Sequence, residues 1–514
     1  MLAFIARRLG ALVLILFGSS FLLYNLAAIS GDPIGSLRFS DDPFAQAQIA
    51  ELELFLRLDV PPPLRYFIWL RGALGVFVGS PDFGLTRNRG PVLDELALAI
   101  PVTIRLVLFA TVIAIVVGIA LGIISALRQY SRFDYSMTFF AFLLFSLPIF
   151  WVAVLLKRYL AISFNNFLAE PDIPWSWRVG IGVAVGLFFA SLFTRSRAHF
   201  WLVLVGVAML IIGFLTFVNS ANLLLEPQLG PIGILLLATF ICLAVVFLST
   251  GLANRPSLYS GMTMAPLTLM SYFLIQGQLQ KDSSIPQLLM FALITAVVAI
   301  GVALIFARQD RGPVVRTTVI AGLLSAGLIV VDKFMRTWKP YMEEGAIDFR
   351  PIPTIGQASE LLPQDDFWLV TLDLLIHLVL PTLALMLISF AGYVRYSRGT
   401  LLEVLNQDYI RTARAKGLTE RTVIMRHAFR NTLIPITTLV VVDFAAVVGG
   451  AIITEQVFGW TGMGTLFNRA IQTIDLNLLM GVFSVTATLA VLANLIADLL
   501  YSALDPRIRV GSGK

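Results

Sequence analysis

The sequence predicts an all-α polytopic membrane protein with about 12 transmembrane helices. Of its 514 residues, 58% are hydrophobic and only 13% are charged, and the mean hydropathy is +0.86. Several apolar runs reach about 20 residues, which is the length of helix that crosses a hydrocarbon layer of ~30 Å. These runs are continuous rather than alternating, and this excludes a transmembrane β-barrel.

Three spans are expected near the N-terminus. Arg7 and Arg8 precede a run that is too long for the core of a signal peptide, so we expect an uncleaved first span with its N-terminus inside. Residues 34–97 are polar enough to lie outside the membrane, although the short apolar stretch 66–70 favours an interfacial position. The three spans are expected at 9–29, 101–127 and 135–164.

The region between about residues 170 and 350 contains further apolar runs. Basic loops recur at every second connection, around Arg197, Arg255 and Arg311, and the intervening turns carry little net charge. This alternation is what loops on the inner and outer sides of a membrane show. Six spans are therefore expected, at 178–194, 200–219, 231–252, 259–279, 287–307 and 315–332.

The C-terminal region predicts three more spans after a polar outer segment at about 333–366. An even total puts both termini on the same side of the membrane, in agreement with the expectation that both are cytoplasmic. The predicted spans are 369–394, 433–453 and 478–504.

The basic balance of the chain has a simple explanation. The net charge is +6 and the isoelectric point is near 9.5, but the basic residues lie mainly in loops between apolar runs. Membrane topology accounts for that distribution, and no nucleic-acid partner is expected. Cys242 is the only cysteine and lies within an apolar run, which excludes an internal disulfide and a metal site built from cysteines.

The most informative segment is residues 408–435, DYIRTARAKGLTERTVIMRHAFRNTLIP, which is rich in positive charge and lies between two apolar runs. It resembles the cytoplasmic coupling loop of ABC-importer permeases of the dipeptide/oligopeptide/nickel branch. The residues that carry this resemblance, and that we take as the expected ATPase-coupling loop, are Tyr409, Arg411, Ala413, Arg414, Ala415, Lys416, Gly417, Leu418, Arg421 and His427.

Other segments are typical of the same family and follow in the expected order. Together they cover roughly residues 1–168 and 352–509. Each is weak alone, and their combination is the specific signal. They are Gly31-Asp32-Pro33, Asp82-Phe83-Gly84-Leu85, Ser146-Leu147-Pro148, His377-Leu378-Val379-Leu380-Pro381, Glu455-Gln456-Val457-Phe458, Gly462-Met463-Gly464 and Asp505-Pro506-Arg507.

The resemblance implies a type I ABC-importer permease core of six transmembrane helices, to which this chain adds about six. We therefore expect the first part of the core at 1–168, an inserted transmembrane region at 169–351, and the second part, with the coupling loop, at 352–514. The family does not imply a role for the insertion. The stretch 412–415 departs from the Glu-Ala-Ala of other importer loops, which favours peptides as cargo and leaves oligosaccharides and nickel open.

The implied protein is one of two permease subunits in the inner membrane of a prokaryote. Its implied partners are a second homologous permease, two ATPase subunits and an extracytoplasmic substrate-binding protein. ATP and magnesium are expected on the ATPase subunits, so this chain binds no cofactor or metal and is not an enzyme. The rival interpretation is an ion-coupled secondary transporter in which Asp443 and His377 are the coupling sites.

Each candidate residue also has a plainer interpretation. Gly417 can let a partner approach closely, or it can belong to an ordinary basic loop. Asp443 lies within a span, where a charge costs about 2.5–3.5 kcal/mol, so it either lines the pathway and meets a substrate amine or makes a buried hydrogen bond. Glu455, Gly462 and Gly464 either form an outer loop that folds back toward the pathway or a simple glycine-rich turn.

Overall fold

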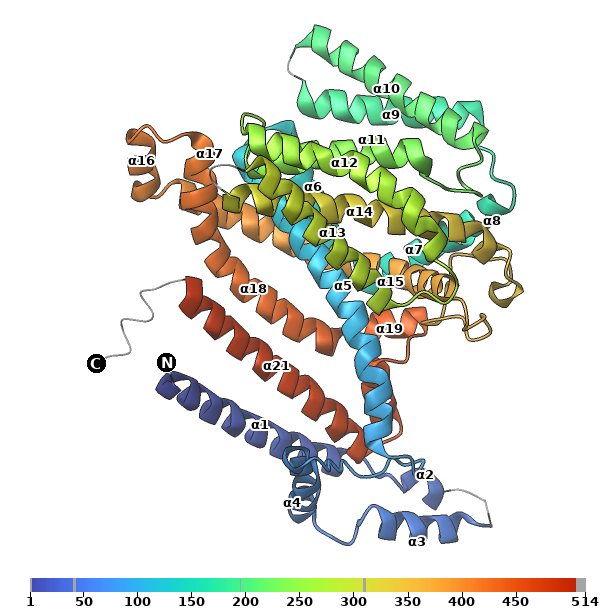
Figure 1. The fold of residues 1–514 in the computed structure, drawn as a ribbon. Helices are drawn as coiled ribbons and strands as arrows, with labels where there is room; N and C mark the ends of the chain where they lie inside the picture. The colour runs from blue at the N-terminus through green and yellow to red at the C-terminus, as the bar shows by residue number, and fades with distance from the viewer. Residues whose placement is uncertain (1, 40–42, 195, 308–310, 505–514) are drawn as a thin grey trace. The chain divides into compact units, whose positions relative to one another are not determined.

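The computed structural model describes residues 2–39, 43–194, 196–307 and 311–504. These residues are mainly helical, and their β pairing is limited to a single bridge between Leu85 and Pro91 (Figure 1). The chain forms two units. Unit 1 contains Met1–Arg158, Ile355–Gln357 and Leu378–Lys514, and unit 2 contains Tyr159–Thr354 and Ala358–His377.

Unit 1 begins with a long apolar helix followed by short helices. Proline at the first helical position starts α4, because its missing N–H needs no partner there. Ser131 caps α6 by accepting a hydrogen bond from the backbone N–H of Asp134. The helices are α1 (Leu2–Ser30), α2 (Gly35–Arg38), α3 (Ala45–Phe55), α4 (Pro62–Ala73), α5 (Val92–Leu127), α6 (Arg132–Ser146) and α7 (Ile149–Leu156).

The predicted third span, at 135–164, is wrong as a single helix. The helix α6 ends at Ser146, and a new helix starts after Pro148. Leu147 takes an extended conformation with ψ 130°, as expected for a residue before proline. The candidate span is instead Ile149–Ala169, which includes a π-helical turn at Lys157–Ser163.

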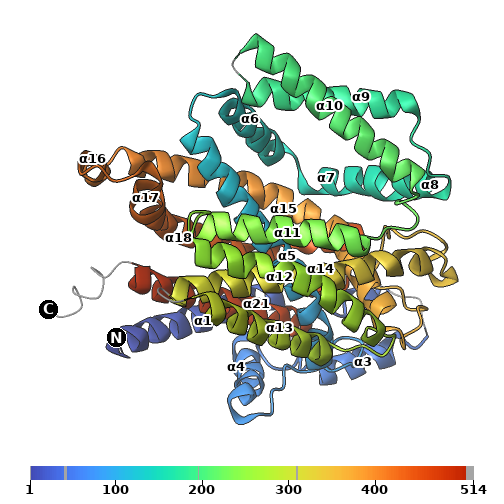
Figure 2. The same ribbon diagram turned by 45° about the horizontal axis from the view of Figure 1, so that its top comes forward.

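The rest of unit 1 follows the long helix α15 (Phe367–Leu405), whose first eleven residues belong to unit 2. In both views α16 and α17 lie at one end of α15 and α18 (Figures 1 and 2). A π-helical turn at Val423–Ala428 joins α17 to α18. The helices are α16 (Asp408–Ala415), α17 (Glu420–Thr422), α18 (Phe429–Gly450), α19 (Ile452–Phe458), α20 (Met463–Gln472) and α21 (Leu476–Leu504).

A core of aromatic residues joins α1 and α4 within unit 1. Tyr66 is completely buried and contacts the rings of Phe21 and Tyr24 at centroid distances of 5.2 and 5.6 Å. Its hydroxyl also lies 2.8 Å from the Ser20 hydroxyl, which satisfies a buried polar group. The apolar stretch 66–70 therefore packs, at Tyr66 and Trp69, against the protein itself.

Unit 2 is built from helices that also reach membrane-spanning length. The polar outer segment predicted to start at residue 333 begins later, because α14 continues through its charged residues to Met342. Asp332 accepts hydrogen bonds from the backbone of Leu229 and Gly230 and from Arg336, at 2.7 to 3.1 Å. The helices are α8 (Phe164–Ala169), α9 (Trp175–Phe193), α10 (Arg197–Ser220), α11 (Gly230–Ser249), α12 (Arg255–Ile275), α13 (Ile285–Phe306) and α14 (Arg311–Met342).

Within the described part of the chain, 11 helical segments are long and apolar enough to cross a membrane. Eleven of the predicted spans correspond to these segments. The twelfth, at 433–453, corresponds to α18, Phe429–Gly450. The sequence therefore located the apolar helices, and the multi-pass membrane character of the protein follows from their number and length.

Candidate functional site

The basic loop folds into a helical hairpin that is anchored on the ends of neighbouring helices. Ile410 and Ala413 are buried on one face of α16. They pack with Ala126 at the end of α5, Leu401 near the end of α15, and Val423. A displacement of α16 must therefore be shared by the helices on which it is packed, because close-packed interiors transmit strain.

The tip of the hairpin is exposed. Ala415, Lys416, Gly417 and Leu418 all face solvent. Gly417 has φ +75°, and a β-carbon added to it would have no atom within 4 Å. The backbone there needs glycine for its conformation, and the space around it is open. Of the two alanines in the expected coupling loop, Ala415 is exposed, whereas Ala413 is buried in the core.

Charged and polar contacts brace the hairpin. Arg414 donates to both carboxylate oxygens of Glu420, at 3.2 and 2.7 Å, and this pair raises the pKa of the guanidinium and lowers that of the carboxyl. Asn431 donates to the Tyr409 hydroxyl at 2.7 Å. Arg414 is therefore paired within the chain. Lys416, at the tip, takes no part in these bracing contacts.

The remaining predicted loop residues lie around this hairpin. Arg411 is exposed and lies 3.5 Å from Asp408 one helical turn earlier. His427 is half-buried in the π-helical turn. The side chain of Arg421 lies outside the described residues.

A buried carboxylate beside the hairpin was not predicted from the sequence. Asp134 accepts two hydrogen bonds from Arg398, at 2.6 and 2.8 Å, one from Ser125 at 2.5 Å and one from the backbone of Tyr130 at 3.0 Å. Burial alone would raise the pKa of Asp134, but these donors outweigh it and the net shift is downward. The cluster ties the end of α5, the start of α6 and α15 together.

Glu455 forms a second buried centre, at the opposite end of α18. Its carboxylate accepts hydrogen bonds from the Thr103 hydroxyl at 2.7 Å and from the backbone N–H of Thr465 at 2.9 Å. A β-carbon at Gly462 would collide with this carboxylate, and one at Gly464 would come within 2.8 Å of the backbone of Ile452. The two glycines therefore permit close packing, and the Glu455 side chain is fully buried.

Asp443 lines a cavity of about 430 Å³ that also includes Tyr393 and Arg395. Arg395 was not predicted as a site residue, because the predicted span ended at residue 394. The sequence did contain a signal for it. An arginine directly after an apolar run can still lie within the helix when aromatic rings cover its guanidinium. Its guanidinium lies 4.1 Å from the centroid of the Phe145 ring.

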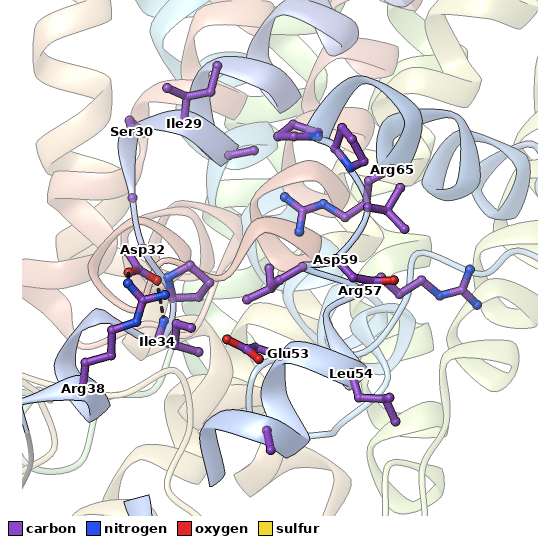
Figure 3. Close-up of a pocket in the computed structure, with 18 residues that line it drawn as sticks. Ile29, Ser30, Asp32, Ile34, Arg38, Glu53, Leu54, Arg57, Asp59 and Arg65 are labelled. Atoms are coloured by element: carbon purple, nitrogen blue, oxygen red, sulfur yellow. Dashed lines mark hydrogen bonds and ion pairs between the residues drawn. The ribbon is translucent and has the colours of Figure 1, made fainter. Parts of the chain in front are cut away.

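A larger pocket of about 1430 Å³ lies between the end of α1 and the short helices α2, α3 and α4. Figure 3 shows Asp32 and Arg38 side by side, with Glu53 on the neighbouring helix α3. Arg38 forms an ion pair of 3.1 Å with Asp32. The Asp32 carboxylate also accepts a hydrogen bond from the backbone N–H of Ile34 at 3.0 Å, so the Gly31-Asp32-Pro33 motif forms a structured turn.

The family comparison agrees with this arrangement. Residues 319–510 match the model of the binding-protein-dependent transport system inner membrane component family. This stretch of the chain is thus similar to the permease domain of that family. The matched stretch includes the whole hairpin, Arg398, the cavity residues on α15 and α18, and Glu455. The predicted terminal motif Asp505-Pro506-Arg507 lies outside the described residues.

Curated relatives of the permease domain carry peptide-transport names. The oligopeptide transport system permease protein OppB of Mycobacterium tuberculosis is 47% identical over 138 residues, which cover 27% of this chain and 42% of that protein. The dipeptide transport system permease protein DppB of Escherichia coli is 39% identical over 173 residues, covering 30% of this chain and 51% of that protein. These matches therefore span about half the length of each relative or less.

A third relative matches along its whole length. The dipeptide transport system permease protein DppB of Alkalihalophilus pseudofirmus is 25% identical over 511 residues, covering 99% of this chain and 100% of that protein. The resemblance to ABC-importer permeases of the peptide branch, expected from the coupling-loop motif, is confirmed by these relatives together with the permease domain.

Proposed function

We propose that this chain is one of two permease subunits of an ATP-driven ABC importer for di- and oligopeptides. The observation that carries the proposal is the hairpin of α16 and α17, with an exposed tip around Gly417 and a buried face packed on α5 and α15. Such a hairpin can receive a force at its tip and pass it to the membrane helices. The family match and the names of the relatives support this assignment.

The proposed mechanism is alternating access. A substrate-binding protein outside the cell delivers the cargo, and two ATPase subunits carry ATP and magnesium. Closure of the ATPases moves α16. The pair of permeases then changes from a state open to one side of the membrane to a state open to the other side. Each partner must bind one of these states better than the other, because a ligand shifts an equilibrium only by its differential affinity.

The proposed topology follows the charges. Lys416 and the arginines of the hairpin support a cytoplasmic position for this end of unit 1 by the positive-inside rule. The Glu455 centre, at the other end of α18, then lies toward the outside of the prokaryotic inner membrane. There the buried carboxylate would hold the shape of the loop that faces the binding protein, and it would not contact cargo directly.

The cargo assignment rests on two observations. The stretch Thr412-Ala413-Arg414-Ala415 resembles the peptide branch, and several relatives are named as oligopeptide or dipeptide permeases. Peptides are therefore the first substrates to test, and oligosaccharides and nickel are the alternatives within the same branch.

Purification of the chain from its native membrane in mild detergent tests the proposal. We expect a second permease and two ATPases to copurify, and we expect the reconstituted complex to take up peptides at the expense of ATP. A chain that purifies alone and transports on a proton or sodium gradient would overturn the proposal in favour of a secondary transporter. Uptake of sugar or nickel with no uptake of peptide would overturn the cargo assignment alone.

A further inference from the structure

The cavity beside Asp443 is built from three helices of unit 1. Ser389, Tyr393, Arg395 and Tyr396 come from α15, Leu439 and Asp443 come from α18, and α6 closes one side with Phe145. Its volume of about 430 Å³ lies in the range of pockets that hold small ligands. It differs from the apolar helix surfaces around it because it contains a carboxylate and a guanidinium.

Two charged groups of this cavity each leave one buried atom without a protein partner. Among the described residues, the Oδ2 atom of Asp443 and the Nε atom of Arg395 are buried and have no hydrogen-bond partner. The Tyr393 hydroxyl lies beside Asp443 and interacts with its carboxylate. Buried polar groups nearly always have hydrogen-bond partners. A buried group without a partner costs free energy, and a ligand that supplies the missing hydrogen bond recovers it.

The same groups are held firmly in place. Rings of Phe142 and Phe145 lie 5.4 and 4.1 Å from the Arg395 guanidinium, which positions it without neutralising it. Tyr393 is almost completely buried, and Gly118 of α5 packs so closely that a β-carbon there would lie 2.6 Å from the Tyr393 β-carbon. A binding site is more effective when its groups are fixed before the ligand arrives.

We propose that this cavity is a cargo subsite that binds the two charged ends of a short peptide, Asp443 taking the α-ammonium group and Arg395 the α-carboxylate. This inference rests on the proposed function and specifies where the permease contacts its cargo. Charge-assisted hydrogen bonds of this kind are strong in a site of low dielectric. A cargo that carries both charges compensates both groups of the cavity at once, whereas a neutral sugar compensates neither.

The position of the cavity suits a step close to the cytoplasmic release of cargo. Arg395 lies one helical turn before Arg398, which binds Asp134 beside the hairpin. The hairpin packs on α15 and continues into α18, so its movement can change the position of Arg395 on α15 relative to Asp443 on α18. Separation of the two charges lowers the affinity of the cavity for a dipolar cargo. Binding and release of the cargo therefore depend on the position of α15.

Protection of an engineered thiol in the complete reconstituted complex tests the subsite. The variant carries Ser389→Cys in the cavity and Cys242→Ser, which removes the one native cysteine. A small thiol reagent is applied with a free dipeptide, with its N-acetyl form or with its C-terminal amide. We expect the free dipeptide to slow labelling at least about fivefold, and each blocked form to protect less. Ser80→Cys in the same background, at an exposed site outside this cavity, is the control that no peptide should protect.

Charge variants identify the two contacts. Asp443→Asn should abolish the difference between the free and the N-acetyl peptide, and Arg395→Gln the difference between the free peptide and the amide. Each should lower peptide uptake by about tenfold, as expected for loss of one charge-assisted hydrogen bond, and Asp443→Glu and Arg395→Lys should retain most of it. A residue with only a structural role would lower the uptake of every cargo equally.

The outcomes separate this inference from the proposed function. If the complex imports peptides but the thiol is never protected and the charge variants transport normally, the subsite is refuted and the function stands. If the unmodified complex imports no peptide, the proposed function fails. If Ser389→Cys does not assemble, the uptake of the Asp443 and Arg395 variants decides the matter.

Discussion

The guanidinium of Arg398 holds the carboxylate of Asp134 through two hydrogen bonds, of 2.6 and 2.8 Å. Ser125 adds a third contact at 2.5 Å, one residue before Ala126 packs into the core beneath α16. The charged pair is therefore part of the support on which the hairpin rests. Asp134 is buried and its partner is partly exposed, which makes the pair stronger than a surface ion pair.

Removal of the carboxylate should destabilise unit 1. Asp134→Ala leaves a partly buried guanidinium and a hydroxyl without their acceptor, so we expect a loss of about 3 kcal/mol in the free energy of unfolding. Unfolding of the purified protein in detergent measures this loss. A double-mutant cycle with Arg398→Ala should show coupling between the two residues, and strict additivity would contradict the assignment.

The same pair predicts a dependence on pH. The pKa of Asp134 is lower in the folded protein than the ordinary value of about 3.9, so its stabilising contribution is complete above that value. It is lost as the pH falls through the lowered, folded pKa. The difference in stability between wild type and Asp134→Asn should be constant at about pH 5 to 8 and shrink below about pH 4. A difference that shrinks as the pH rises would contradict this sign.

Several helix boundaries could not be read from hydropathy, and the charged pairs explain why. Arg395 and Arg398 ended the predicted span at 394, yet α15 continues to Leu405 because aromatic rings and Asp134 compensate these cations. Asp332 and Arg336 likewise neutralise each other within α14. Hydropathy counts each charge alone, whereas the folded helix contains the charge together with its partner.

Gly417 permits a test in which folding and coupling respond differently. Aspartate tolerates the left-handed backbone conformation better than most residues, and no atom lies within 4 Å of the added β-carbon. Gly417→Asp should therefore insert and fold normally but abolish ATP-driven uptake. Gly79 is a matched control, with φ +79° and equally open surroundings, and Gly79→Asp should transport normally. Equal uptake by both variants would refute the role of the hairpin tip.

Glu455 should contribute to stability rather than contact cargo. Glu455→Ala leaves the Thr103 hydroxyl and the Thr465 backbone N–H without their acceptor, so we expect a loss of about 2–4 kcal/mol in the free energy of unfolding. Thr454 is the neighbouring control, because its buried hydroxyl has no hydrogen-bond partner among the described residues. Thr454→Val should not lower the stability, because it removes an unsatisfied buried hydroxyl with little change of shape. Unfolding in detergent compares the two variants, and equal losses would contradict this interpretation.

The candidate site was only partly predictable from the sequence. The loop motif located the hairpin and its glycine, because these depend on local sequence. It could not show that Ala413 faces the core while Ala415 is exposed, which depends on contacts with α5 and α15. Nor could it pair Arg395 with Asp443, which lie 48 positions apart in the sequence and meet only when α15 packs against α18.

The length of α15 limits how its two ends can influence each other. From Arg395 to Leu405 the helix rises roughly 15 Å, at about 1.5 Å per residue. Exposed charges at physiological ionic strength are screened over about 8 Å. In the proposed complex the nucleotide would lie farther still from cargo near Arg395, so displacement of the helix is the stronger route between the two sites. Added salt should therefore weaken docking at Lys416 without altering the coupling of complexes that remain assembled.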